Sequence, residues 1–287
     1  MSLAQELTVV VKTFERPEAL RRLVGSIRRF YPDVPVVVVD DSAEPLEPPP
    51  DGVTRYCHVA FNSLGVSAGR NYGVREVETP YTLICDDDMV LGDRTDVARM
   101  LRTVQTTRFD VVSCRWLDHE PWRSIPRGYR RYEGTLDVED GVLVHRLGAT
   151  RGEIEGLPVF DVVHQFFVAP TELLRANPWD EGFRVAGEHV DFFLRLKDAG
   201  VLCTRLPDAT VEHRPALPPS YAAYRADTAA DTRRLNEVRG VDGYVTVGRL
   251  FTRSDRVVHE LPGTLVAGGK RAARVARRLV REGRLRA

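Results

Sequence analysis

Residues 79–91 read TPYTLICDDDMVL, an apolar run that ends abruptly in three adjacent aspartates. Residues 81–85 are rich in side chains that favour β-strands, and apolar residues resume directly after the acids. The pattern predicts a buried strand whose end carries Asp86, Asp87 and Asp88.

Three adjacent carboxylates need partners in a folded core. They repel one another and are costly to remove from water, so a cation or a hydrogen-bond donor has to offset their charge. On an extended backbone Asp86 and Asp88 point to the same side, and such oxygen ligands suit Mg²⁺ or Mn²⁺, ions that also hold substrate phosphates. A solvated acidic turn is the alternative, and the flanking sequence has to distinguish the two.

Length and composition predict a soluble globular protein. The chain has 287 residues, of which 43% are hydrophobic and 29% charged. This length suits one large α/β domain or two small ones. The 41 basic and 41 acidic residues cancel, so we expect no nucleic-acid polymer as a partner.

The cysteines and the apolar runs bear on the cellular compartment. The four cysteines lie far apart, with no CxxC pair and no Cys/His cluster at zinc spacing, so we expect free thiols. We find neither a secretory signal pattern nor an apolar run long enough to span a membrane. We therefore predict a cytoplasmic protein.

The first forty residues predict a strand, a helix and a second strand. Residues 7–14 and 36–39 are β-branched runs typical of central parallel strands, and Pro17 opens a helix with a clear apolar face between them. In open parallel sheets the ligand lies beyond the carboxyl ends of the strands. Polar residues follow both strands there, namely Thr13 and Glu15 after the first and Asp40 and Asp41 after the second.

A stretch rich in small residues precedes the acidic strand. Residues 62–73, NSLGVSAGRNYG, predict a helix entry that allows close backbone approach and favours an anion. Arg70 adds a fixed positive charge that can grip phosphate or a base. The stretch is neither a P-loop nor a GxGxxG fingerprint.

The remaining elements follow from apolar periodicity and turn residues. We expect a helix near 94–107, strands over 109–116 and 161–169, a hairpin over 136–145 that turns at 139–141, a helix from 170, a helix over 190–196, and strands over 201–206 and 211–213. Residues 117–132 combine aromatic and arginine side chains with helix breakers, which is typical of a binding loop or lid.

Two single residues attract notice. Asp191 falls in the first turn of a predicted helix, where it is either a general base at a pocket mouth or an acid that complements the helix dipole. His213 follows a strand, and a lone histidine in that place is more often structural.

Taken in order, the motifs resemble glycosyltransferases of the GT-A fold. The motifs are VVKTFERPEALRRLVGSI, VVVVDDS, GVSAGRNYGV, the strand ending in DDD, EHVDFF and VEH, and they span residues 7–213. The match is to glycosyltransferase family 2, in particular to the catalytic domain of the β-1,4-N-acetylgalactosaminyltransferases. The resemblance implies an α/β fold, a mostly parallel, doubly wound, Rossmann-like sheet with helices on both faces.

The resemblance also implies a domain layout and an activity. We expect a catalytic domain over residues 1–250 and a C-terminal extension over 251–287 that ends in a basic helix. The implied reaction is a metal-dependent, inverting transfer of a hexose or N-acetylhexosamine from a UDP-sugar to a hydroxyl of a glycan or small-molecule acceptor. Mn²⁺ or Mg²⁺ is the implied cofactor.

Site residues are carried over by matching positions. Those implied to contact the nucleotide sugar are Thr13, Glu15, Asp40, Asp41, Arg70, Asn71, Asp86 and Asp87. Those implied at the metal are Asp88, His213 and Asp86.

The base and the acceptor site are less tightly matched. Asp191 matches the position of the acidic base, but many relatives have an adjacent Glu-Asp pair, whereas here Glu188 and Asp191 are separated by two residues, so both are candidates. We assign acceptor contact to Trp116, Trp122 and His164 without a transferable motif.

Three other classes compete with this interpretation. A sugar-nucleotide-binding protein without catalysis would be expected to lack metal ligands or a base, and both sets are present. A nucleotidyltransferase usually has a glycine-rich basic loop after the first strand, and residues 12–17, KTFERP, are not one. A dehydrogenase would need the glycine fingerprint there.

The C-terminal residues 270–287, KRAARVARRLVREGRLRA, carry a strong local charge. Eight basic residues face a single acid, Glu282, and a helix would have a narrow apolar stripe at Val275 and Leu279. Such a helix can lie on an anionic membrane surface, and the alternative is a solvated terminal helix.

Overall fold

The computed structural model describes residues 2–47, 49–119, 126–216, 218–226, 228–248 and 250–252, with short pieces at 266–268, 274–275 and 278. The helices are α1 Leu3–Glu6, α2 Pro17–Phe30, α3 Gly65–Arg75, α4 Val97–Thr106, α5 Thr171–Ala176, α6 Glu188–Asp198, α7 Pro219–Ala226 and α8 Ala229–Arg239. None of these described helices is long and apolar enough to cross a membrane.

The strands of the described residues form one large and two small sheets. Their bounds are β1 Leu7–Thr13, β2 Val36–Asp40, β3 Arg55–His58, β4 Tyr81–Asp86, β5 Met89–Val90, β6 Val111–His119, β7 Pro126–Arg130, β8 Gly134–Glu139, β9 Val142–Leu147, β10 Glu153–Ile154, β11 Leu157–Pro158, β12 Phe166–Pro170, β13 Cys203–His213, β14 Gly243–Val247, β15 Phe251–Thr252 and β16 Val266–Gly268.

The main sheet confirms the expected fold class. Its order is β15-β7-β6-β12-β4-β1-β2-β3, and the four strands β4, β1, β2 and β3 are parallel to one another. β12 runs antiparallel between β4 and β6, while β13 pairs in parallel with β6. The sheet is therefore mixed, with a parallel half that carries the acidic strand end.

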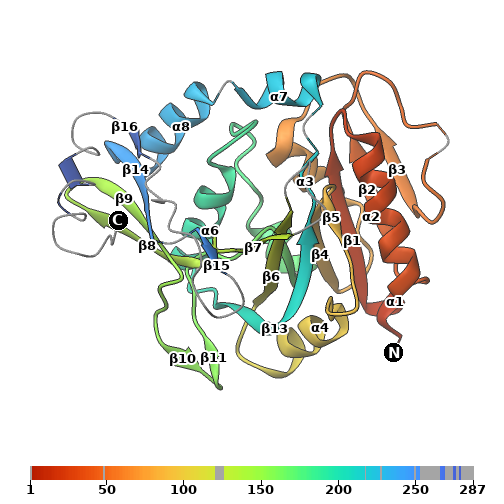
Figure 1. The fold of residues 1–287 in the computed structure, drawn as a ribbon, viewed down its shortest axis with the longest axis horizontal. Helices are drawn as coiled ribbons and strands as arrows, with labels where there is room; N and C mark the ends of the chain where they lie inside the picture. The colour runs from red at the N-terminus through yellow and green to blue at the C-terminus, as the bar shows by residue number, and fades with distance from the viewer. Residues whose placement is uncertain are drawn as a thin grey trace.

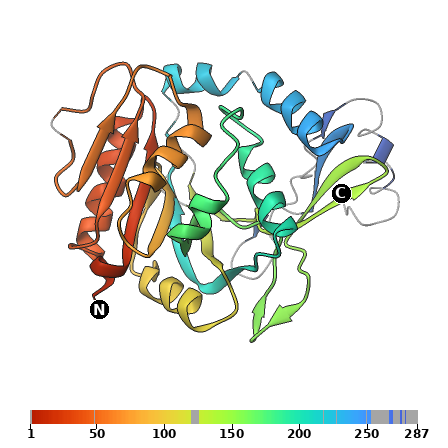
Figure 2. The ribbon, with the colours of Figure 1, turned by 180° about the vertical axis from the view of Figure 1, so that it is seen from behind.

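Helices cover both faces of the main sheet, which explains the unbroken β-branched runs. Val9 and Val11 of β1 pack in one core cluster with α2 and α4, whereas Val10 packs in another with α3, α5 and α6. α2 accordingly lies in front of the strands in Figure 1 and behind them in Figure 2. The two cores hold the carboxyl ends of β1 and β4 side by side.

A smaller sheet of order β16-β14-β9-β8 lies to the side of the main one, beneath α8 (Figure 1). Residues assigned to the C-terminal extension join both sheets, because β15 pairs with β7 and β16 pairs with β14. Val275 is only 3% exposed and packs with valines of β9 and β14. The expected solvated or membrane-facing stripe is thus wrong at Val275, while most of the basic tail lies outside the described residues.

Several element boundaries differ from the sequence-based expectation. The strand expected over 161–169 begins at Phe166, because the preceding residues make other contacts: Asp161 pairs with Arg151 and His164 with Glu133. The described residues of the expected loop over 117–132 are largely strand, since β6 runs to His119 and β7 covers Pro126–Arg130. The two strands expected over 201–213 are one, β13, with an irregularity between Arg205 and Thr210.

The hairpin of β8 and β9 is confirmed at its expected turn. Asp140 and Gly141 both have positive φ, 49° and 75°, the backbone conformation that the favoured two-residue hairpin turn requires. Helix α6 begins slightly earlier than expected, at Glu188, after Gly187 in a left-handed conformation with φ 80°. This start places Glu188 at the very beginning of the helix.

Candidate functional site

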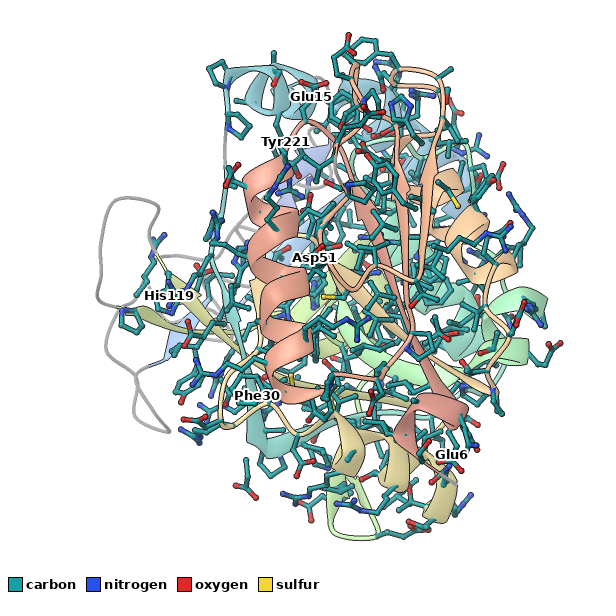
Figure 3. All side chains as sticks on the ribbon, turned by 90° about the vertical axis from the view of Figure 1, so that its right-hand side faces the viewer. Glu6, Glu15, Phe30, Asp51, His119 and Tyr221 are labelled. Atoms are coloured by element: carbon teal, nitrogen blue, oxygen red, sulfur yellow. The ribbon has the colours of Figure 1, made fainter. Side chains whose placement is uncertain are left out.

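A cavity of about 640 Å³ opens where β1, β4 and β13 end. The starts of α3 and α6 bound this cavity, and α7 covers it. Figure 3 shows Tyr221 of α7 beside the N-terminus of α2. Charged residues that line it are Lys12, Arg16, Arg70, Asp86, Asp88, Asp118, Arg127, Arg130 and Glu188. The sequence motifs therefore converge on one space.

Each of the three aspartates at the end of β4 (Asp86, Asp87 and Asp88) has a cationic partner. Asp86 accepts a hydrogen bond of 2.9 Å from Arg70 Nη2. Asp87 is fully buried, accepts one of 2.6 Å from Thr13 Oγ1, and pairs with Arg16. Asp88 accepts one of 2.7 Å from Arg16 Nη1. The interpretation as a solvated acidic turn is therefore wrong.

Arg16 is a site residue that sequence analysis did not assign. It is 8% exposed, its guanidinium contacts both Asp87 and Asp88, and it lies 4.0 Å from the centre of the Tyr221 ring. Burial would lower the pKa of Arg16, but the two aspartates outweigh it and raise the pKa further. The available signal was its place just beyond the end of β1, where polar residues were already expected to line the crevice.

Burial and Arg16 act on both Asp87 and Asp88, yet the net shift in pKa has opposite signs at the two aspartates. Burial raises the pKa of Asp87 above its ordinary value, even though Arg16 opposes the change. Burial would also raise the pKa of Asp88, but Arg16 and His213 outweigh burial there and lower the pKa. Asp88 is therefore the better-stabilised anion of the pair.

His213 lies beside Asp88, as the resemblance implied. Its Nε2 is 3.5 Å from Asp88 Oδ2, while its Nδ1 bonds Asp118, which sequence analysis missed. Burial would lower the pKa of His213, but Asp88 and Asp118 raise it to about 9. Asp118 follows the loss of apolar alternation near the end of β6, a signal too weak to single it out.

The pair of Asp88 and His213 fits a divalent cation in chemistry. Once an incoming ion has displaced the proton on Nε2 of His213, a carboxylate oxygen and an imidazole nitrogen 3.5 Å apart can bind that ion together, and Asp118 fixes the ring as metal-bound histidines usually require. No group of three or more candidate ligands occurs in the part of the chain that the structure describes, so substrate oxygens would have to complete the shell. Asp86 is turned to Arg70 instead.

Of the four residues expected at uridine, one lines the cavity and three do not. Thr13 lines the cavity. Asp40 instead accepts hydrogen bonds from Tyr56 and Ser42, and Asp41 accepts one from the amide of Gly65 at the start of α3. Glu15, at a positive φ of 55°, accepts one from the amide of Ala43. The last three hold loops around the cavity without lining it.

Arg70 and Asn71 also differ in role. Arg70 lines the cavity and joins Asp86 to Glu188, whose Oε1 is 3.2 Å from Nη1. Asn71 makes two hydrogen bonds of 2.9 Å with the backbone of Trp179 and does not line the cavity. Arg70 is therefore placed to meet a ligand, whereas Asn71 holds α3 in position.

The two candidate bases are clearly separated by their surroundings. Glu188 lines the cavity at the start of α6. Asp191 lies one turn further along α6, is 2% exposed, and is bonded by Arg195 Nε at 3.0 Å and Arg239 Nε at 2.8 Å. Asp191 does not line the cavity, because Arg239 of α8 draws its carboxylate away. The match of Asp191 to the position of the acidic base therefore has no geometric support.

Aromatic rings form part of the cavity lining, which we call the aromatic wall (Trp116, Tyr132, His164, His189 and His213). Trp116 stacks between His164 and His213, with ring centres 4.5 and 4.9 Å apart, and Tyr132 meets His189 edge-on at 4.9 Å. Burial lowers the pKa of His164 and His189, so both rings are neutral. Trp116 and His164 thus lie at the cavity as expected, and Trp122 lies outside the described residues.

The cavity combines a charged end with an aromatic wall. The charged end can bind a diphosphate through a cation and Arg70, and aromatic faces can pack against the C–H face of a sugar ring. Glu188 lines the same cavity and is a carboxylate able to accept a proton.

Comparison with known proteins gives concordant results. Residues 8–139 match the family described as Glycosyl transferase family 2. The chain is 33% identical over 237 residues to beta-1,4 N-acetylgalactosaminyltransferase 2 of Mus musculus, covering 77% of this chain and 44% of that protein. It is 34% identical over 255 residues to beta-1,4 N-acetylgalactosaminyltransferase 1 of Homo sapiens, covering 81% and 45%. The chain therefore spans less than half the length of these relatives.

Solved structures support the fold. A crystal structure of S. aureus TarS superposes with a TM-score of 0.54 at 16% identity, covering 82% of this chain and 65% of that one. A second structure of TarS, in complex with UDP, gives a TM-score of 0.52, covering 80% and 65%. Residues 8–139 of the chain are therefore a glycosyl transferase family 2 domain.

Proposed function

We propose that the chain transfers a hexose or N-acetylhexosamine from a UDP-sugar to a hydroxyl group of a glycan or small-molecule acceptor, with inversion and with the aid of Mn²⁺ or Mg²⁺. The observation that carries this proposal is the joint presence of Asp88, His213 and Glu188 in one cavity of about 640 Å³. A cavity of this size suits a nucleotide sugar. The names of the relatives and the UDP complex of TarS support the class of donor.

Leaving-group stabilisation falls to the charged end of the cavity. A divalent cation bound by Asp88 and His213 would supply positive charge where the diphosphate becomes more negative. Arg70, held by Asp86 and Glu188, can donate hydrogen bonds to phosphate oxygens from the other side. Arg16 keeps Asp87 paired, so that this buried carboxylate does not compete for the ion.

Activation of the acceptor falls to Glu188. Its carboxylate can take the proton of a hydroxyl group that attacks the sugar on the face opposite the diphosphate. The contact of 3.2 Å with Arg70 fixes its position. A single base is enough for direct displacement, and inversion follows from attack on the opposite face.

The test is UDP release from a panel of UDP-sugars, with and without acceptors, in Mn²⁺ and after EDTA. We expect turnover in Mn²⁺ that EDTA removes and that Asp88→Asn lowers by a hundredfold or more. Asp208→Asn is the matched control, because Asp208 is 74% exposed in its side chain and pairs only at the surface with Arg99.

Two outcomes would contradict the proposal. Unchanged turnover in EDTA and in Asp88→Asn would remove the metal. Tight UDP-sugar binding without release of UDP from any member of the panel would make the chain a sugar-nucleotide-binding protein.

A further inference from the structure

Gln165 has a buried amide that lacks partners. It directly precedes β12, is 5% exposed and lines the cavity. Neither its Nε2 nor its Oε1 has a hydrogen-bond partner among the residues that the structure describes. A buried amide without partners is costly, and native proteins seldom leave both of its polar atoms unsatisfied. An unpaired amide at a cavity therefore points to a ligand group that completes it.

The sheet fixes where this amide lies. Phe166 pairs with Cys85 across β12 and β4, so Gln165 stands one residue beyond, beside the position of Asp86 at the carboxyl end of β4. Its neighbour His164 is held by Glu133 Oε2 at 3.0 Å and by the carbonyl oxygen of Arg130 at 2.9 Å. The backbone of Gln165 is thus positioned by a core strand on one side and a bonded histidine on the other.

Two members of the aromatic wall also have an unpaired polar atom. Within the described residues, Trp116 Nε1 and His189 Nδ1 have no hydrogen-bond partner, and both residues line the cavity. His189 Nε2 is 2.7 Å from the carbonyl oxygen of Val163, so Nε2 carries the proton and the neutral ring keeps Nδ1 as an acceptor. The aromatic wall and Gln165 thus present to the cavity an N–H donor, a nitrogen acceptor and a complete amide.

The amide chemistry selects a ligand class. The acetamido group of an N-acetylhexosamine has one carbonyl oxygen and one N–H, which match Gln165 Nε2 and Oε1, and its methyl group can pack on aromatic rings. A hexose hydroxyl in the same place offers a single oxygen to the two polar atoms. We propose that Gln165 recognises the acetamido group of an N-acetylhexosamine, an inference that rests on the proposed function and names its substrate class.

The acetamido group can belong to the donor or to the acceptor, and the experiment separates the two. UDP release is measured for UDP-N-acetylgalactosamine against UDP-galactose, and then for acceptors with and without an N-acetyl group. We expect wild type to favour the acetamido member of one pair, and Gln165→Leu to lower kcat/KM for that member by about tenfold or more through the lost hydrogen bonds. The other member should change by less than about threefold.

Gln105→Leu is the matched control, because Gln105 lies on α4 and makes an exposed contact with Glu6. An equal loss for both members of each pair, or no preference in wild type, would overturn the role of Gln165 while leaving the glycosyltransferase proposal intact.

If no UDP-sugar is turned over, the proposed function fails, and calorimetry with the same two UDP-sugars still tests Gln165. Binding of UDP-N-acetylgalactosamine that is tighter than that of UDP-galactose, and that Gln165→Leu reduces to the same level, would support the assignment for the donor. Equal binding of both by wild type and variant would overturn it.

Discussion

At the scale of single residues, side-chain chemistry was predictable and side-chain direction was not. The sequence placed acids after β1, β2 and β4, and the structure shows that only some of them reach the cavity. Asp191 is the instructive case, because its helix was expected but its partner Arg239 lies on α8, 48 residues further along the chain. A choice between Glu188 and Asp191 depends on such distant contacts, which no local pattern contains.

Arg16 leads to a prediction about stability. Replacing it with methionine leaves Asp87 fully buried without its cation, so we expect the free energy of unfolding to fall by about 3–5 kcal/mol. Urea unfolding measures the loss. Arg55→Met is the control, because that arginine pairs with Glu76 at the surface and should change stability by less than about 1 kcal/mol. Equal effects of the two substitutions would show that Arg16 does not neutralise the acidic strand end.

At the scale of elements, regular patterns were predicted well and irregular junctions were not. The hairpin turn at Asp140 and Gly141 followed from local backbone chemistry. The late start of β12 did not, because residues 161–165 read as strand but make other contacts, among them a backbone bridge from Val162 to Gly134 of β8 and a side-chain pair of Asp161 with Arg151. Contacts made outside the element overrode its local preference.

Gly187 gives a prediction about the start of α6. Its φ of 80° and a Phe183 ring atom 3.1 Å from an added Cβ make Gly187→Ala strained, so we expect a loss of stability of about 1–2 kcal/mol or more. Because the change displaces the next residue, Glu188, kcat should fall by at least about tenfold. Gly25→Ala in α2 is the control, since nothing lies within 4 Å of its added Cβ, and it should stabilise by about 0.5–1 kcal/mol. A fully active, equally stable Gly187→Ala protein would contradict the argument.

At the scale of the whole molecule, the two-faced sheet was predictable and the attachment of the C-terminal residues was not. Unbroken β-branched strands require cover on both faces, and α2 and α3 provide it. The basic tail was expected to be solvated or bound to a membrane. Instead Val275 is buried against the smaller sheet and Arg278 pairs with Glu139 and Asp140 of the hairpin. A charge count over the tail alone could not reveal acids that lie more than a hundred residues away.

Buried histidines between the two sheets predict acid sensitivity. Burial lowers the pKa of His145, which is fully buried in β9, to about 4. The unfolded chain binds a proton near pH 6.5 and the folded chain does not, so stability is lost as the pH falls from 6.5 toward 4.

From pH 7 to pH 5, His145 alone should account for a loss of about 2 kcal/mol in the free energy of unfolding. We therefore expect the free energy of unfolding, measured in urea, to fall between pH 7 and pH 5 by about 2 kcal/mol less in His145→Gln than in wild type. The same difference in both proteins would mean that His145 does not contribute.

The central claim is that Glu188 accepts the proton of the attacking hydroxyl in the cavity. The most direct measurement is kcat for UDP release in the presence of acceptor, compared between Glu188→Gln and Glu172→Gln, a substitution at a glutamate whose side chain is 80% exposed on α5. We predict a loss of a hundredfold or more for Glu188→Gln, with UDP-sugar binding retained, and no change for Glu172→Gln. The contrary result is a kcat near the wild-type value in Glu188→Gln and a loss of a hundredfold or more in Asp191→Asn. That result would assign the role of base to Asp191 and contradict the account.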